Sequence, residues 1–208
     1  MADGAIVGRR PAAPVATENV EGNARLTGVS GAALFGLLAV EGVTILRIHD
    51  LLSVHVFVGM VIAAFAVTKL ASVGYRFARY YLGDPAYVRK GPPPMILRIV
   101  GPLVVVTTIA VVGTGIVALA VGRSARWLVD LHKVSFICWF AVTTVHVIGH
   151  VLDTPRLAVA DWRGSEGVPV PGAALRRLTL VVTLLTGLVL GYAVLHSGWL
   201  DTWHRVRG

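Results

Sequence analysis

The chain has 208 residues and a net charge of +8, and hydrophobic residues make up 55% of it while charged residues make up only 14%. A soluble domain carries about 25% charged residues, and the mean hydropathy here is +0.74. This composition excludes a soluble globular enzyme and a disordered chain. Cys138 is the single cysteine, which excludes a disulfide-stapled fold and a CxxC metal or redox site.

Long apolar segments separated by short basic loops contain the excess of hydrophobic residues. A helix crosses about 30 Å of hydrocarbon with roughly 20 predominantly apolar residues, and these segments do not alternate as the strands of a membrane barrel would. We therefore predict an all-α integral membrane protein, a bundle of five transmembrane helices. The predicted helices span residues 26–48, 51–82, 96–121, 127–152 and 175–196. Residues 1–25 are predicted to be disordered, and residues 198–208 to form a short tail.

The distribution of positive charge predicts the orientation of the bundle. Cytoplasmic loops of membrane proteins are enriched in Lys and Arg, and most of these residues lie on the side that carries the N-terminus. The opposite side receives only Arg47, Arg123, Arg126, Lys133, Arg205 and Arg207. We therefore expect a multi-pass plasma-membrane protein with a cytoplasmic N-terminal segment and an external C-terminal tail. Because this topology accounts for the net charge, the expected partner is the lipid bilayer and not a nucleic acid.

Histidines are placed at related positions in the second and fourth predicted helices. An ionisable side chain inside a membrane is costly, so each one is a candidate functional residue. His132 and His146 are 14 positions apart, which is about 21 Å along a helix and within about 40° of one face. His55 and Lys69 have the same spacing, on a helix that runs parallel because one helix lies between the two. We therefore expect His55 beside His132 at one depth, and Lys69 beside His146 at another.

Two imidazoles that face each other across a helical bundle form a bis-histidine site for a haem iron, because a neutral imidazole nitrogen suits the axial position. We predict that His55 and His132 bind a haem near the outer face, and that His146 is a provisional ligand of an inner haem. Gly59, one turn after His55, is predicted to leave room for the macrocycle. The alternative for His55 and His132 is two interhelical hydrogen-bonding histidines that stabilise the packing of the helices. For His146 and His150 the alternatives are a polar patch or a zinc site.

A parallel pair of membrane helices, each with His-x13-His or a close variant, resembles the transmembrane haem domain of ferric reductases and NADPH oxidases. More loosely, it is similar to other membrane b-type cytochromes. The resemblance covers roughly residues 51–151. It implies two b haems stacked across the bilayer, with His55 and His132 at the outer haem and His146 as half of the inner site. Lys69 stands where the fourth histidine would be, so a second haem requires His150 or an exogenous ligand.

Other polar positions keep two interpretations each. Lys69 is either a lysine whose amine reaches the membrane surface or a ligand or proton-relay group. Glu41 either pairs with a polar group of a neighbouring helix or handles protons. The basic, aromatic residues within 75–81 either anchor the chain at the membrane surface or bind a haem propionate, a quinone head or a lipid phosphate.

These features together predict a membrane b-type cytochrome that relays electrons through haem b to or from a separate redox partner, with a quinone as a further candidate partner. One haem is expected, or two if the inner site is complete. The sequence has no GxGxxG after a strand pattern, no catalytic nucleophile and no phosphate loop. We therefore expect an electron-transfer subunit and not an independent enzyme. The main alternative is a haem-free membrane anchor or assembly subunit. The third is a small transporter, for which the sequence lacks an inverted repeat of broken helices.

Overall fold

A computed structural model describes residues 15–91, 95–122, 124–150 and 172–204 of the chain. Within these residues the chain is helical and has no strand. The long helices are α1 (Val15–Leu46), α2 (Ile48–Tyr81), α4 (Met95–Val121), α5 (Arg126–His150) and α7 (Ala173–Leu195), and the short ones are α3 (Pro85–Lys90) and α8 (Asp201–His204). In this described part of the chain, five helices are long and apolar enough to cross a membrane. The prediction of an all-α chain with five helices of membrane-spanning length is therefore confirmed, and these helices indicate a multi-pass membrane protein.

The first helix begins earlier than its apolar core suggests. Residues 15–25, which were predicted to be disordered, form the start of α1, and residues 1–14 lie outside the described part of the chain. Buried Val20 packs against α3. Asn23 Nδ2 donates a hydrogen bond to the Ser72 carbonyl of α2 at 3.1 Å, and Ser72 Oγ donates to Asn23 Oδ1 at 2.7 Å. These contacts with α2 and α3 stabilise polar turns whose composition alone favours disorder.

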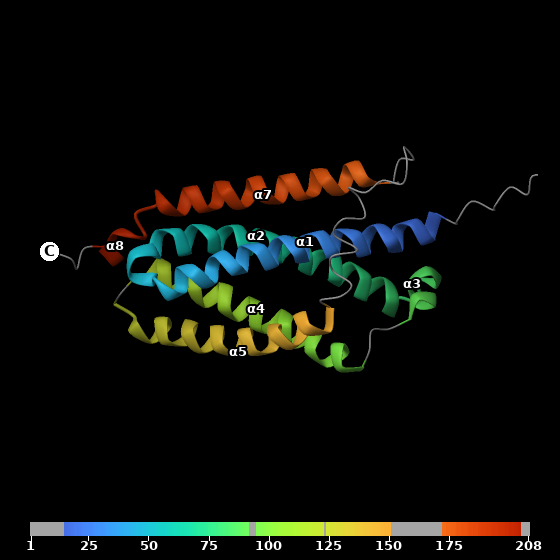
Figure 1. Cartoon of the computed structure of the whole chain (residues 1–208), viewed down its shortest axis with the longest axis horizontal. Coiled ribbons are helices and arrows are strands. Elements are labelled where there is room, and N and C mark those ends of the chain that lie inside the picture. The colour runs from blue at the N-terminus through green and yellow to red at the C-terminus, as the bar shows by residue number, and fades with distance from the viewer. Residues whose placement is uncertain (1–14, 92–94, 123, 151–171, 205–208) are drawn as a thin grey trace, which may run out of the picture.

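The long helices form two groups that lie side by side (Figure 1). In the first group, α2 packs along α1 on one side and along α7 on the other. In the second group, α4 and α5 pack against each other as an antiparallel pair. The groups meet mainly where α2 contacts α4, whereas α2 and α5 do not pack along each other. Because α4 returns the chain across the bundle, α2 and α5 run in the same direction, as the sequence predicts.

Glycines allow α7 to approach α2 closely. A Cβ atom at Gly187 would lie 2.8 Å from the Val61 Cα, and one at Gly191 would lie 2.7 Å from Phe57 Cδ2. Small residues at such a contact let two helix backbones approach, which is the usual basis of helix association in membranes. The first helix group is therefore closely packed where α7 meets α2.

The C-terminal segment folds across one end of the bundle, where part of the short tail predicted for residues 198–208 forms α8. Leu200 is only 5% exposed and packs with Val56 of α2 and Leu119 of α4. Trp203 Nε1 donates a hydrogen bond to the Leu119 carbonyl at 3.5 Å. Residues 205–208 lie outside the described part of the chain. This apolar cluster joins the two helix groups next to the candidate site, because Val56 directly follows His55 in the sequence.

Candidate functional site

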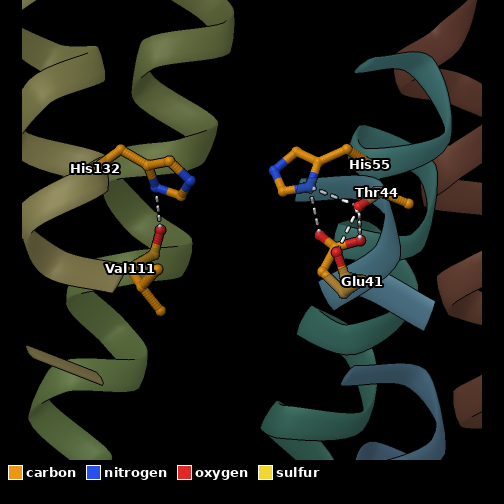
Figure 2. Close-up of polar contacts among 5 residues, drawn as sticks. All are labelled: Glu41, Thr44, His55, Val111 and His132. Carbon is orange, nitrogen blue, oxygen red and sulfur yellow. Dashed lines mark hydrogen bonds and ion pairs between the residues drawn. The ribbon is translucent and has the colours of Figure 1, made fainter. Parts of the chain in front are cut away.

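Two histidine rings face each other between the two helix groups (Figure 2). His55 lies near the start of α2 and His132 near the start of α5, so both rings are toward the end of the bundle that carries α8. The ring centroids are 6.4 Å apart and the ring planes differ by 71°. The placement of these two histidines at one depth, which the sequence predicts, is therefore present in the structure.

The ring of His55 is fixed by two polar residues of α1. Its Nδ1 atom lies 3.0 Å from Glu41 Oε1 and 3.1 Å from Thr44 Oγ1. Thr44 Oγ1 in turn lies 2.7 Å from the Glu41 carbonyl and 3.1 Å from Glu41 Oε2. Glu41 and Thr44 are three positions apart on one helix, so they share the face that α1 turns toward α2. Both are buried, with exposures of 9% and 2%. Glu41 therefore pairs with a polar group of a neighbouring helix, and the interpretation that it handles protons stays a hypothesis.

The ring of His132 is fixed by the backbone of α4. Its Nδ1 atom lies 3.0 Å from the Val111 carbonyl and 3.3 Å from Thr114 Oγ1. A helical carbonyl bonds the N–H four residues later, so the side chain of residue 115 lies over the carbonyl of Val111. This residue is Gly115, and a Cβ atom there would lie 2.9 Å from His132 Cε1. Gly115 therefore opens the path by which the ring reaches the carbonyl.

The partners of Nδ1 determine which ring nitrogens face the gap. A carboxylate and a carbonyl oxygen accept hydrogen bonds, so we assign the proton of each neutral ring to Nδ1, from which it is donated to Glu41 and to Val111. In this assigned tautomer the Nε2 atom of each ring has a free lone pair. In Figure 2 the two Nε2 atoms point toward each other from His55 and His132. An N–H donated to a carboxylate or carbonyl is the arrangement that orients a metal-binding histidine.

The hydrogen bonds of the two rings do not join the helix groups. His55 bonds only to α1 and His132 bonds only to α4, so each ring is held within its own group. Each bond nevertheless joins two helices, α2 to α1 and α5 to α4, so both residues are interhelical hydrogen-bonding histidines, which is the structural alternative that the sequence leaves open. The two rings are not bonded to each other, since their centroids are 6.4 Å apart.

The residues predicted for an inner haem site do not form an arrangement like that of His55 and His132. Lys69 Nζ donates a hydrogen bond to the Thr27 carbonyl of α1 at 3.2 Å, which directs the amine to α1 and so away from α5. His146 lies half-buried on α5, and the side chain of His150 is outside the described part of the structure. The inner site therefore stays a prediction.

The prediction that Gly59 leaves room for a macrocycle is wrong. A Cβ atom at Gly59 would lie 3.5 Å from Glu41 Oε1, so this position faces the carboxylate on α1. The reason is that α1 packs against the face of α2 that carries the Nδ1 edge of His55, and not against the face that carries Nε2. The glycine that does border a histidine ring is Gly115 on α4. The sequence contains no signal for it, because only the tertiary contact with α5 identifies it among the many glycines.

The pair by itself offers two ligands, fewer than a bare metal ion needs. In the described parts of the chain, no group of three or more His, Cys, Asp or Glu side chains could hold a metal ion. Comparison with family models, with curated proteins and with solved structures finds no match for this chain. The geometry of the His55 and His132 pair is therefore the observation on which a function can be argued.

Proposed function

We propose that this protein is a membrane b-type cytochrome in which His55 and His132 are the axial ligands of one haem b. The observation that carries the proposal is the opposed pair of Nε2 atoms, each on a ring fixed through Nδ1, with ring centroids 6.4 Å apart. A metal–imidazole bond is about 2.0 Å long and the bonding nitrogen lies about 1.1 Å from its ring centroid, so two rings on opposite sides of one metal ion have centroids about 6 Å apart. The observed separation fits.

The number of ligands favours haem over a bare ion. A structural zinc site takes four ligands from the protein, whereas haem brings four equatorial nitrogens and leaves two axial positions. His55 and His132 come from α2 and α5, which do not pack along each other. When bound, haem supplies reversible one-electron transfer.

The residues around the pair hold both rings in position. Glu41 and Thr44 fix the tautomer and rotation of His55, and Val111 fixes those of His132. The rings sit on long helices, and the apolar cluster around Leu200 clamps α2 to α4 close by. A ligand site on rigid helices with its own hydrogen-bonded support keeps its geometry when the charge of the bound group changes.

The setting of the site follows from the charge distribution. The excess of Lys and Arg on the N-terminal side supports a cytoplasmic N-terminus and an external C-terminus in the plasma membrane. The His55 and His132 pair then lies near the outer face. Electrons would come from or go to a separate redox partner, a protein or a quinone. His146 would serve an inner haem, and the second ligand of that site is not assigned to Lys69, since its amine bonds to α1.

Haem content of the purified full-length protein tests this proposal. Pyridine haemochrome analysis should give one haem per chain, with a Soret band that shifts when dithionite is added. His55→Ala and His132→Ala should each lose the haem, while His49→Ala, which alters an exposed histidine of the same helix α2, should keep it.

Two results would contradict the cytochrome. One is a wild-type protein that carries no haem when it is made in cells with sufficient haem. The other is full haem content in both ligand variants. Two haems per chain, with one lost in His146→Ala, would extend the proposal to the inner site. A haem-free, folded protein would favour the anchor or assembly subunit.

A further inference from the structure

We propose that the buried carboxylate of Glu41 gives His55 the character of an anionic ligand and thereby lowers the reduction potential of the site. This inference rests on the proposed haem function. In it Glu41 is a positioning residue, because it acts through His55 and does not itself contact the iron. The starting observation is an asymmetry between the two rings, since the Nδ1 partner of His55 is a carboxylate and that of His132 is the neutral carbonyl of Val111.

Both carboxylate oxygens of Glu41 have a polar partner inside the protein. Oε1 lies 3.0 Å from His55 Nδ1, and Oε2 lies 3.1 Å from Thr44 Oγ1. Gly59 of α2 faces this group, since a Cβ there would lie in ordinary contact with Oε1, at 3.5 Å. A carboxylate in a membrane-spanning helix is costly. A neutral carbonyl or amide oxygen could accept the hydrogen bond from His55, as the Val111 carbonyl does for His132. The need for a hydrogen-bond acceptor therefore does not by itself explain a carboxylate at this position.

What the carboxylate adds is negative charge next to one axial ligand. An iron porphyrin with two neutral imidazoles has a net charge of +1 when the iron is ferric and no net charge when it is ferrous. The charge of Glu41 therefore favours the ferric form, both directly and by making the imidazole of His55 a stronger electron donor. The carboxylate and the iron would be about 7 Å apart across the imidazole ring, and at an effective dielectric constant of about 20 opposite unit charges at that distance change an equilibrium by more than tenfold.

The redox step itself moves a single electron. An external one-electron reductant, dithionite in the experiment below, is oxidised as the iron goes from the ferric to the ferrous state. No bond to Nε2 of His55 or His132 breaks, and the proton stays on Nδ1 of His55 between the ring and Glu41. Glu41 thus acts on the equilibrium of this step only through its charge and its hydrogen bond.

Optical redox titration of the purified full-length protein tests the role of Glu41. Glu41→Gln keeps the shape of the side chain and an oxygen acceptor but removes the charge. We expect it to retain the wild-type haem content and helical circular dichroism. At the wild-type midpoint its ratio of ferrous to ferric haem should rise about tenfold, a positive shift of about 59 mV for one electron. Its low-temperature electron paramagnetic resonance spectrum should change as well, because the hydrogen bond at Nδ1 alters the donor strength of the imidazole.

Asp50→Asn is the matched control. Asp50 is an exposed carboxylate at the start of α2, paired at the surface with Arg47, so this variant removes the same charge from the same end of the bundle. Its midpoint should remain at the wild-type value. If Glu41→Gln fails to hold haem, Glu41→Asp decides instead, because it keeps the charge but withdraws it from Nδ1 of His55. We expect a positive shift in the same direction as for Glu41→Gln, and smaller.

The outcomes separate this inference from the proposed function. A wild-type protein without haem would overturn the cytochrome proposal and this inference with it. A Glu41→Gln protein that holds haem with an unchanged or lowered midpoint would overturn the role of Glu41 and leave the cytochrome intact. The same is true of an unchanged or lowered midpoint in Glu41→Asp when it serves as the deciding variant. A shift of equal size in Asp50→Asn would show that general surface charge sets the potential, and would also overturn it.

Discussion

Replacement of Gly115 by alanine should displace the ring of His132. The new Cβ atom would lie 2.9 Å from His132 Cε1 and 3.2 Å from Nδ1, closer than carbon and nitrogen atoms normally approach. The backbone of α4 cannot easily retreat, because Trp139 of α5 donates a hydrogen bond from Nε1 to Thr108 Oγ1 at 3.0 Å and holds the helix pair together. The ring must therefore rotate away and lengthen its bond to the Val111 carbonyl.

The size of the effect follows from these contacts. Loss of the hydrogen bond to Val111 costs about 0.5–1.5 kcal/mol, and a ring turned out of its rotamer costs about 0.5–1.5 kcal/mol. Alanine in place of glycine within a helix stabilises the folded state by about 0.5–1 kcal/mol. Gly113 provides the matched control, because it lies in the same helix and a Cβ there would meet nothing within 4 Å. Gly115→Ala should therefore be about 1–3 kcal/mol less stable than Gly113→Ala.

Thermal unfolding in detergent micelles and haem content per chain together measure this effect. We expect Gly113→Ala to match or exceed the wild-type protein in stability and to bind haem fully. Gly115→Ala should unfold at a lower temperature and, because the Nε2 atom of His132 is no longer aimed at the gap, should hold less haem. If the two alanine variants behave alike in both assays, Gly115 does not provide the space for the His132 ring and the reasoning is refuted.

Two further predictions concern residues away from the histidine pair. Lys69→Met should leave the haem content unchanged, because the amine bonds to a carbonyl of α1; a loss of one haem per chain in the haemochrome assay would instead make Lys69 a ligand. At the start of α3, the backbone N–H of Ala86, and after it the charge of Arg79, hold the pKa of Asp84 below its ordinary value of 3.8. The stabilising contribution of this lowered pKa is therefore complete above 3.8 and disappears as the pH falls through the folded value. The hydrogen-exchange protection of the Ala86 amide should fall with it, and Asp84→Asn, which cannot ionise, should show no such pH dependence.

The sequence alone determined the spans and the heights of the histidines. Hydrocarbon requires about 20 apolar residues in a helix, so the apolar segments predict α1, α2, α4, α5 and α7 without tertiary information. One membrane-spanning helix, α4, lies between α2 and α5, so these two helices run in the same direction. The rise of 1.5 Å per residue then gives the depth of His55 and of His132 along their helices. Both quantities are local or topological, which is why the meeting of these rings can be predicted before any packing is known.

The tertiary structure alone decided which groups contact the Nδ1 atom of each histidine ring. Which face of α2 meets α1 depends on how the two helices rotate against each other, and that rotation puts Glu41, and not a macrocycle, beside Gly59. It also directs Lys69 to a carbonyl of α1. The partner of His132 is a backbone carbonyl that any residue at position 111 would supply, so no sequence pattern marks it. Apolar helices have many nearly equivalent faces, and only the packed bundle selects among them.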